Sequence, residues 1–99
     1  MVMFRKLQEI MSSGGEDVWT SFYRAMESEG CIDVKYLEHT TGQDLESAVK
    51  HADRLSKEEV CTWLTWILRG ERFCEGLFES CIENGSFSAL LSRGVELSK

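Results

Sequence analysis

The chain has 99 residues, a formal net charge of −6, a hydrophobic content of 42% and no proline. This length and composition favour a single domain, residues 1–99, with enough apolar side chains to build a core. The negative charge disfavours nucleic-acid backbones as partners. No stretch reaches the roughly 18 apolar residues of a membrane-spanning helix, so no membrane partner is expected either.

Apolar side chains recur at intervals of three and four residues along most of the chain, which predicts helices rather than strands. The N-terminal half is expected to form four helices, at residues 2–11, 16–28, 34–39 and 43–52. Asp33 is the expected N-cap of the third helix. On that helix, Val34 and Leu37 are expected to point into the core, and Tyr36 to bridge core and solvent.

The C-terminal half carries the strongest helical pattern and is expected to organise the fold. Ser56 and Glu59 have the spacing of a capping box, which predicts a long, well-buried helix starting at Ser56. Gly70 interrupts the pattern, either as a left-handed cap or as a glycine tolerated within a helix. A further helix is expected to stop at the Asn84-Gly85 pair, because both residues tolerate positive φ.

These elements predict an all-α fold, a compact bundle of five to six helices. Its core is expected around a seam of four large side chains, Trp63, Trp66, Phe73 and Leu77. A short last helix is expected at residues 87–91, ended by the Arg93-Gly94 pair, with residues 95–99 as a frayed tail.

Four cysteines would allow disulfide bonds. Three of them, Cys61, Cys74 and Cys81, fall on or beside apolar helical stripes, where a free cysteine acts as a small hydrophobe. We therefore expect free thiols, and the lack of a secretory leader pattern favours a cytoplasmic location. No cysteines or histidines have the close spacing of a zinc site, so neither a metal nor another cofactor is expected.

A cluster of opposite charges around Gly70 and Gly76 supplies the candidate binding residues, Arg69, Glu71, Arg72 and Glu75. Two arginines on one side of a helix can hold a carboxylate or a phosphate through paired hydrogen bonds. The two glycines would let a ligand or another backbone approach closely. The same charges also fit an arginine–glutamate lattice that ties helices together, or a docking patch for another protein.

The sequence gives little support for catalysis and supplies no catalytic residue. It has no nucleophile elbow, no phosphate loop and no cysteine–histidine pairing, so an enzyme is disfavoured. Glu75, Glu79 and Glu83 form a carboxylate ridge that fits a solvated helix face better than an acid–base pair. Residues 43–52 and 56–68 have the lengths of a helix-turn-helix, but the second helix lacks a basic edge.

Residues 69–77, RGERFCEGL, combine uncommon residue types at fixed spacing, between an apolar helix and a later Leu-Leu pair. This stretch resembles a family of small bacterial and archaeal proteins classed as a domain of unknown function. The resemblance implies a prokaryotic, intracellular, helical protein and no particular reaction.

A second pattern is similar to the last helices of death-fold modules such as caspase-recruitment domains. It is formed by Gly70, Phe73, Leu77, Gly85, Leu90 and Leu91. That resemblance implies a six-helix interaction module. The chain departs from such modules because their long second and third helices, with charged docking faces, are missing here.

Together these observations favour an interaction or regulatory module that binds another protein. The alternative is a small-ligand or enzymatic site around residues 69–75. A concave pocket lined by Arg69, Arg72 and a tryptophan would favour a ligand, whereas an exposed apolar patch would favour a protein partner. The sequence decides neither the oligomeric state nor the identity of that partner.

Overall fold

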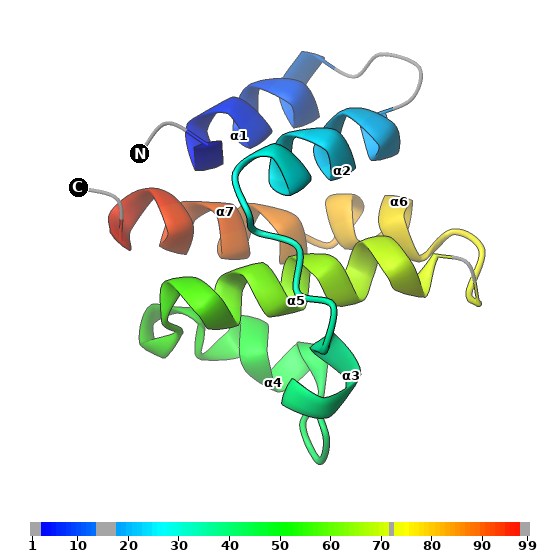
Figure 1. Cartoon of the computed structure of the whole chain (residues 1–99), viewed down its shortest axis with the longest axis vertical. Helices are drawn as coiled ribbons and strands as arrows, with labels where there is room; N and C mark the ends of the chain where they lie inside the picture. The colour runs from blue at the N-terminus through cyan, green and yellow to red at the C-terminus, as the bar shows by residue number, and fades with distance from the viewer. Residues whose placement is uncertain (1–2, 14–17, 72, 98–99) are drawn as a thin grey trace.

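The computed structural model describes residues 3–13, 18–71 and 73–97 (Figure 1). These residues form seven α-helices, one 3-10 helix and no strand, which confirms the all-α fold. The elements are α1 (Met3–Ser13), α2 (Val18–Ser28), α3 (Tyr36–His39), α4 (Leu45–Lys50), η1 (Ala52–Arg54), α5 (Lys57–Gly70), α6 (Leu77–Glu83) and α7 (Ser86–Leu97).

Helix α5 runs through the middle of the bundle, with α1, α2 and α7 on one side and α3 on the other, while α4 and η1 pack against α7 (Figure 1). α7 packs against both α5 and α1, and α1 packs against α2. α6 packs against α5 and α7. Within the part of the chain that the structure describes, no helix is long and apolar enough to cross a membrane.

The predicted start of α5 is confirmed. The Ser56 hydroxyl accepts a hydrogen bond from the Glu59 amide at 3.2 Å, and the Glu59 carboxylate accepts one from the Ser56 amide at 3.1 Å. Every residue from Val60 to Thr65 is buried, and so are Ile67 and Leu68. The helix is therefore covered on more than one side, as its broad apolar stripe predicts.

The predicted core seam is only partly right. Trp63 is buried, and Trp66 and Leu77 are half-buried, but Phe73 is 86% exposed. The cause is that α6 begins at Leu77, so that Phe73 lies in a turn outside any helical register.

Three other aromatic rings, from α2, α6 and α7, take the central place instead. The centroids of Phe22, Phe78 and Phe87 lie 5.0 to 5.7 Å from one another, in edge-on or tilted arrangements. Such pairs add to the stabilisation that their buried area provides. The core is thus centred where α2, α6 and α7 meet beside α5.

The predicted inward orientation of Val34 and Leu37 is wrong. Val34 is 78% exposed and Leu37 is 65% exposed, while Tyr36 between them is buried. The helix begins two residues later than predicted, at Tyr36, and has only one turn. Because the helix is this short, only Tyr36 of these three side chains is buried.

The last helix is longer than predicted, because α7 continues through Gly94 to Leu97. Gly94 is buried, and a Cβ atom placed on it would overlap the Phe4 ring of α1. A glycine costs a helix about 1 kcal/mol relative to alanine. Here it allows α1 and α7 to pack closely, so the glycine serves helix packing and does not end the helix.

Gly94→Ala should destabilise the protein by about 1–3 kcal/mol, because the added methyl group must displace the Phe4 ring. Urea unfolding measures the change. Ser92→Ala, at an exposed position of the same helix, is the control and should stay within about 0.5 kcal/mol of the parent protein. A neutral or stabilising Gly94→Ala would contradict the close contact between α1 and α7.

Candidate functional site

Arg69, the first candidate binding residue, faces α2. Its Nη2 donates a hydrogen bond to the Tyr23 hydroxyl at 2.8 Å, and its guanidinium carbon lies 5.8 Å from the centre of the Tyr23 ring. Trp19 stacks on that ring and donates from its indole nitrogen to the carbonyl of Leu68 at 2.8 Å. Arg69 therefore ties the end of α5 to α2 through an aromatic platform.

Glu71 folds the turn between α5 and α6. One carboxylate oxygen accepts from the Gly76 amide at 3.0 Å, and the other accepts from the Phe78 amide at 2.9 Å. The amides of Phe78 and Gly76 hold the pKa of Glu71 below its ordinary value of 4.5. The carboxylate thus satisfies donors at the start of α6 that the helix itself leaves unpaired.

Of the other two candidates, the structure describes Glu75 alone. Glu75 is exposed, and Arg72 lies outside the described residues. Arg69 and Glu71 turn towards different helices. A shared binding role for the four residues stays a prediction.

An apolar groove lies between α3, the end of α5 and the start of α6. It has a volume of about 260 Å³ and is lined by Tyr36, Leu37, Trp66, Gly70, Phe73, Cys74 and Leu77. Leu37 and Phe73 are both largely exposed. We call this feature the apolar groove.

Two glycines shape the apolar groove. Gly70 is the last residue of α5, and a Cβ atom on it would come within 2.7 Å of a Leu77 methyl group. Gly70 is therefore a helical glycine that lets Leu77 pack against α5. Gly76 has φ +90°, in the left-handed region, and turns the chain into α6 just before Leu77. The predicted close approach is made at Gly70, by a side chain of the same protein, whereas a Cβ atom on Gly76 would meet nothing within 4 Å.

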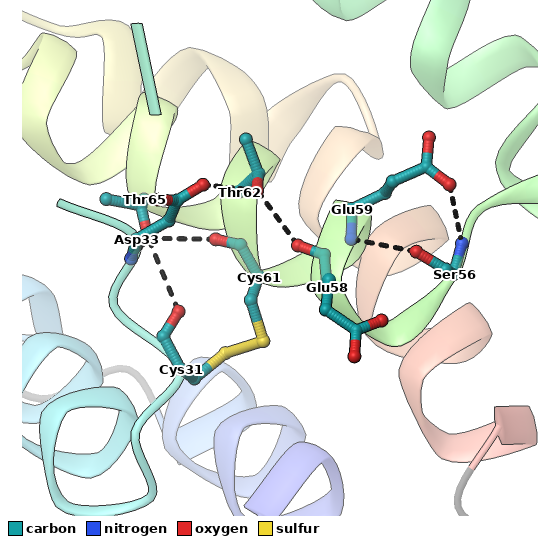
Figure 2. The surroundings of a disulfide bond; sticks show 8 residues. All are labelled: Cys31, Asp33, Ser56, Glu58, Glu59, Cys61, Thr62 and Thr65. Atoms are coloured by element: carbon teal, nitrogen blue, oxygen red, sulfur yellow. Dashed lines mark hydrogen bonds between the residues drawn. A yellow bond between two sulfur atoms is a disulfide. The ribbon is translucent and has the colours of Figure 1, made fainter. Parts of the chain in front are cut away.

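A second pocket, of about 330 Å³, has a more polar lining and lies where residues 30–39 meet the first half of α5. Its lining consists of Gly30, Cys31, Ile32, Asp33, His39, Lys57, Glu58, Cys61 and Thr62. We call it the polar pocket. Both sulfur atoms of a Cys31–Cys61 disulfide belong to residues of this lining (Figure 2).

The disulfide contradicts the expectation that Cys61 is a free thiol. Gly30, with φ +70°, turns the chain after α2 and brings Cys31 to within 5.2 Å of Cys61, measured between Cα atoms. The apolar stripe of α5 correctly predicted that Cys61 is buried, but it contains no information about Cys31, which lies in a loop. Cys74 and Cys81 are free, and burial raises the pKa of the Cys81 thiol.

Asp33 connects the polar pocket to α5. Its carboxylate accepts from the Thr62 hydroxyl at 2.6 Å, and His39 Nδ1 lies 2.6 Å from the same oxygen. Its amide donates to the Thr65 hydroxyl at 3.1 Å. Burial pushes the pKa of Asp33 upward, but hydrogen bonds from Thr62, His39 and the Lys35 amide outweigh it and lower the pKa below 3.8.

The prediction that Asp33 is the N-cap of the third helix is wrong, because the N-cap of α3 is Lys35, and the bonds of Asp33 to α5 were not predicted. A signal was present in α5, where Thr62 and Thr65 interrupt the apolar stripe. Both are buried, and buried hydroxyl groups need hydrogen-bond partners. Among the residues with described positions, no three His, Cys, Asp or Glu side chains are placed to hold a metal ion.

The fold, the apolar groove and the polar pocket define a small helical protein in which these two hollows lie beside α3 and α5. A model of the Family of unknown function (DUF6508) matches residues 8–99, and the chain belongs to that family. This match confirms the resemblance to a domain of unknown function. It tests neither the nine-residue run as a signature nor a bacterial or archaeal origin, and it gives no support to the death-fold resemblance.

No curated protein and no solved structure matches the chain.

Glu71→Ala should destabilise the protein by about 1–2 kcal/mol at pH 7, because two amides at the start of α6 lose their acceptor. The folded-state pKa of Glu71 is lowered, so its contribution is present above pH 4.5 and is lost as the pH falls through the lowered value. The difference between the variant and the parent protein should therefore shrink in acid.

Urea unfolding at pH 7 and at several values below pH 4.5 measures this difference. Glu75→Ala is the matched control, because Glu75 lies exposed in the same turn. An equal loss of stability for Glu71→Ala at all these pH values would show that the carboxylate charge has no part in it.

Proposed function

We propose that the protein is an interaction module and that the apolar groove docks a helix of another protein. The observation that carries this proposal is the 86% exposure of Phe73 at the edge of the groove, next to the 65% exposed Leu37. Exposed large apolar side chains that gather around a hollow are typical of protein interaction sites.

The lining of the apolar groove favours a protein partner over a small polar ligand or an enzyme substrate. Apart from Tyr36 and the thiol of Cys74, the groove is lined by apolar side chains and glycine. Ligand sites normally add a few convergent polar groups that fix orientation. Arg69, the expected polar anchor of the alternative small-ligand site, is engaged by Tyr23.

The predicted docking patch and the apolar groove share one stretch of chain. Gly70, Phe73 and Cys74 line the groove and lie within residues 69–75. The apolar members of this stretch would supply contact area. The charged members, Arg69, Glu71, Arg72 and Glu75, would then act by supporting the turn or by setting the charge around it.

Charge favours a basic helix as the occupant. Exposed charges of both signs adjoin the groove residues in sequence, Lys35 as well as Glu38 and Glu75, so the preference for a basic partner comes from the net charge of the chain. A second copy of the chain would bring two proteins of charge −6 together, whereas lysine and arginine on a partner helix would be attracted. Binding an apolar helix face in a groove is a common mode of peptide recognition.

Two synthetic helical peptides of about four turns test the proposal. Both carry the same apolar face, but one has lysine and arginine on its polar face and the other has glutamate. We expect the basic peptide to bind and to change the fluorescence of Trp66, which lines the groove. Phe73→Ser should weaken this binding by about tenfold or more, because it removes the exposed aromatic anchor.

Val34→Ser is the control, since Val34 is also apolar and 78% exposed but does not line the groove. The proposal fails if neither peptide binds, or if Phe73→Ser and Val34→Ser behave alike. Sedimentation of the protein alone over a range of concentrations tests the competing occupant, and a concentration-dependent dimer lost in Phe73→Ser would replace the peptide proposal.

We also propose a cytoplasmic location in a bacterial or archaeal cell. The resemblance of residues 69–77 to small intracellular prokaryotic proteins supports it. Fractionation of the producing cells tests it, and recovery of the protein outside the cytoplasmic fraction would overturn it.

A further inference from the structure

The connection from α2 to α3 is attached to α5 partly through polar and covalent links. Asp33 bonds to Thr62 and Thr65, and the Cys31–Cys61 disulfide joins the same two segments (Figure 2). Tyr36, which is buried, and Ile32, which packs partly buried against the core, supply the apolar contribution, because Val34 and Leu37 are exposed. The position of α3 therefore depends on two apolar side chains and a few discrete bonds.

The disulfide is within reach of small molecules. Cys31 and Cys61 both line the polar pocket, and its volume of about 330 Å³ exceeds that of a small thiol. Cys61 keeps 8% of its surface exposed, compared with 3% for Cys31. The same lining carries charges of both signs, from Lys57, Asp33 and Glu58.

We infer that the Cys31–Cys61 disulfide is a site of thiol–disulfide exchange with small thiols that enter the polar pocket, and that its reduction loosens α3. This effect would regulate the apolar groove, because Tyr36 and Leu37 of α3 form one of its walls. The regulatory consequence rests on the proposed function, whereas the exchange itself does not.

The reaction consumes two thiols. A thiolate attacks Sγ of Cys61, the sulfur–sulfur bond breaks, and its electron pair leaves with Sγ of Cys31, which takes up the proton that the incoming thiol released. A second thiol then attacks the mixed disulfide at the small-molecule sulfur, and Cys61 leaves as a thiol. Two small thiols are oxidised to their disulfide, and the protein disulfide is reduced to two cysteines.

The setting of the cysteines agrees with a reversible role. If the protein lies in the cytoplasm, as proposed above, this agreement follows because disulfides there are usually transient and serve redox sensing or catalysis, whereas access of a thiol to the disulfide does not depend on the location. Both cysteines are buried in the core, but both also line the polar pocket, so a small thiol would reach the cross-link from that pocket while the fold stays intact. The polar links of Asp33 would remain after reduction and would hold α3 less tightly.

Reduction of the native protein by dithiothreitol tests the exchange. Samples are quenched in acid and labelled with a maleimide under denaturing conditions, and intact mass gives the number of thiols. The oxidised protein should carry two labels, on Cys74 and Cys81, and the reduced protein should carry four. We expect a reduction rate that rises in proportion to dithiothreitol concentration.

A rate that reaches a plateau equal to the unfolding rate, or no reduction without denaturant, would overturn the inference. Either result would mean that thiols do not reach the disulfide from the polar pocket in the folded protein.

Hydrogen exchange tests the effect on α3. Amides of residues 35–40 should exchange about tenfold faster or more after reduction, while those of residues 87–91 in α7 should be unchanged. The double variant C31S/C61S should match the reduced protein. Unchanged exchange of α3 in both would refute the loosening.

These measurements need no partner, so they stand apart from the peptide experiment. If the peptide fails to bind while reduction proceeds as expected, the groove proposal falls and the exchange site remains. If the peptide binds equally to oxidised and reduced protein, the exchange site has no regulatory link to the apolar groove.

Discussion

Burial of α5 on several sides is the constraint on which the rest of the structure depends. Val60, Leu64, Ile67 and Leu68 are fully removed from solvent, and each such side chain stabilises the fold by about 1.5–3 kcal/mol relative to an exposed one. Because α5 presents apolar groups in several directions, other helices must cover it from different sides. α6 and α7 pack against it directly, and α7 in turn holds α1.

The neighbours of α5 are attached in two physically different ways. On one side α7, α6, α1 and α2 interlock through large apolar side chains, with the rings of Phe22, Phe78 and Phe87 at the centre. On the other side α3 is held by Tyr36, by the bonds of Asp33 and by a disulfide. Local stability follows the density of buried contacts, so the side of the bundle that carries both hollows is also its more easily opened side.

Local signals in the sequence predicted local structure well. The capping box at Ser56, the apolar stripe of α5 and the stop at Gly85, which has φ +85°, all depend on residues close in the chain. Contacts between residues far apart in the chain were harder to predict from the sequence. The stripe that placed Phe73 in the core assumed that a helix ran through Gly76, but this glycine is left-handed and delays α6 until Leu77.

The same limit applies to the candidate sites. The charged stretch at residues 69–75 was visible because it is compact in sequence, whereas the polar pocket joins residues 30–39 to residues 57–62. Only the buried Thr62 and Thr65 hinted at a polar partner across that distance. The disulfide could not be predicted from local sequence, since each cysteine taken alone has the pattern of an ordinary buried apolar residue.

The contact of Phe4 with Gly94 joins the two ends of the described chain, and it has a consequence for how the protein is made. A ribosome releases α1 and α2 well before α7, so α2 can pack against α1 early while the side of α1 that faces α7 waits for that helix. During that interval this side of α1 is open to chaperones, and the bundle closes only after translation has delivered α7.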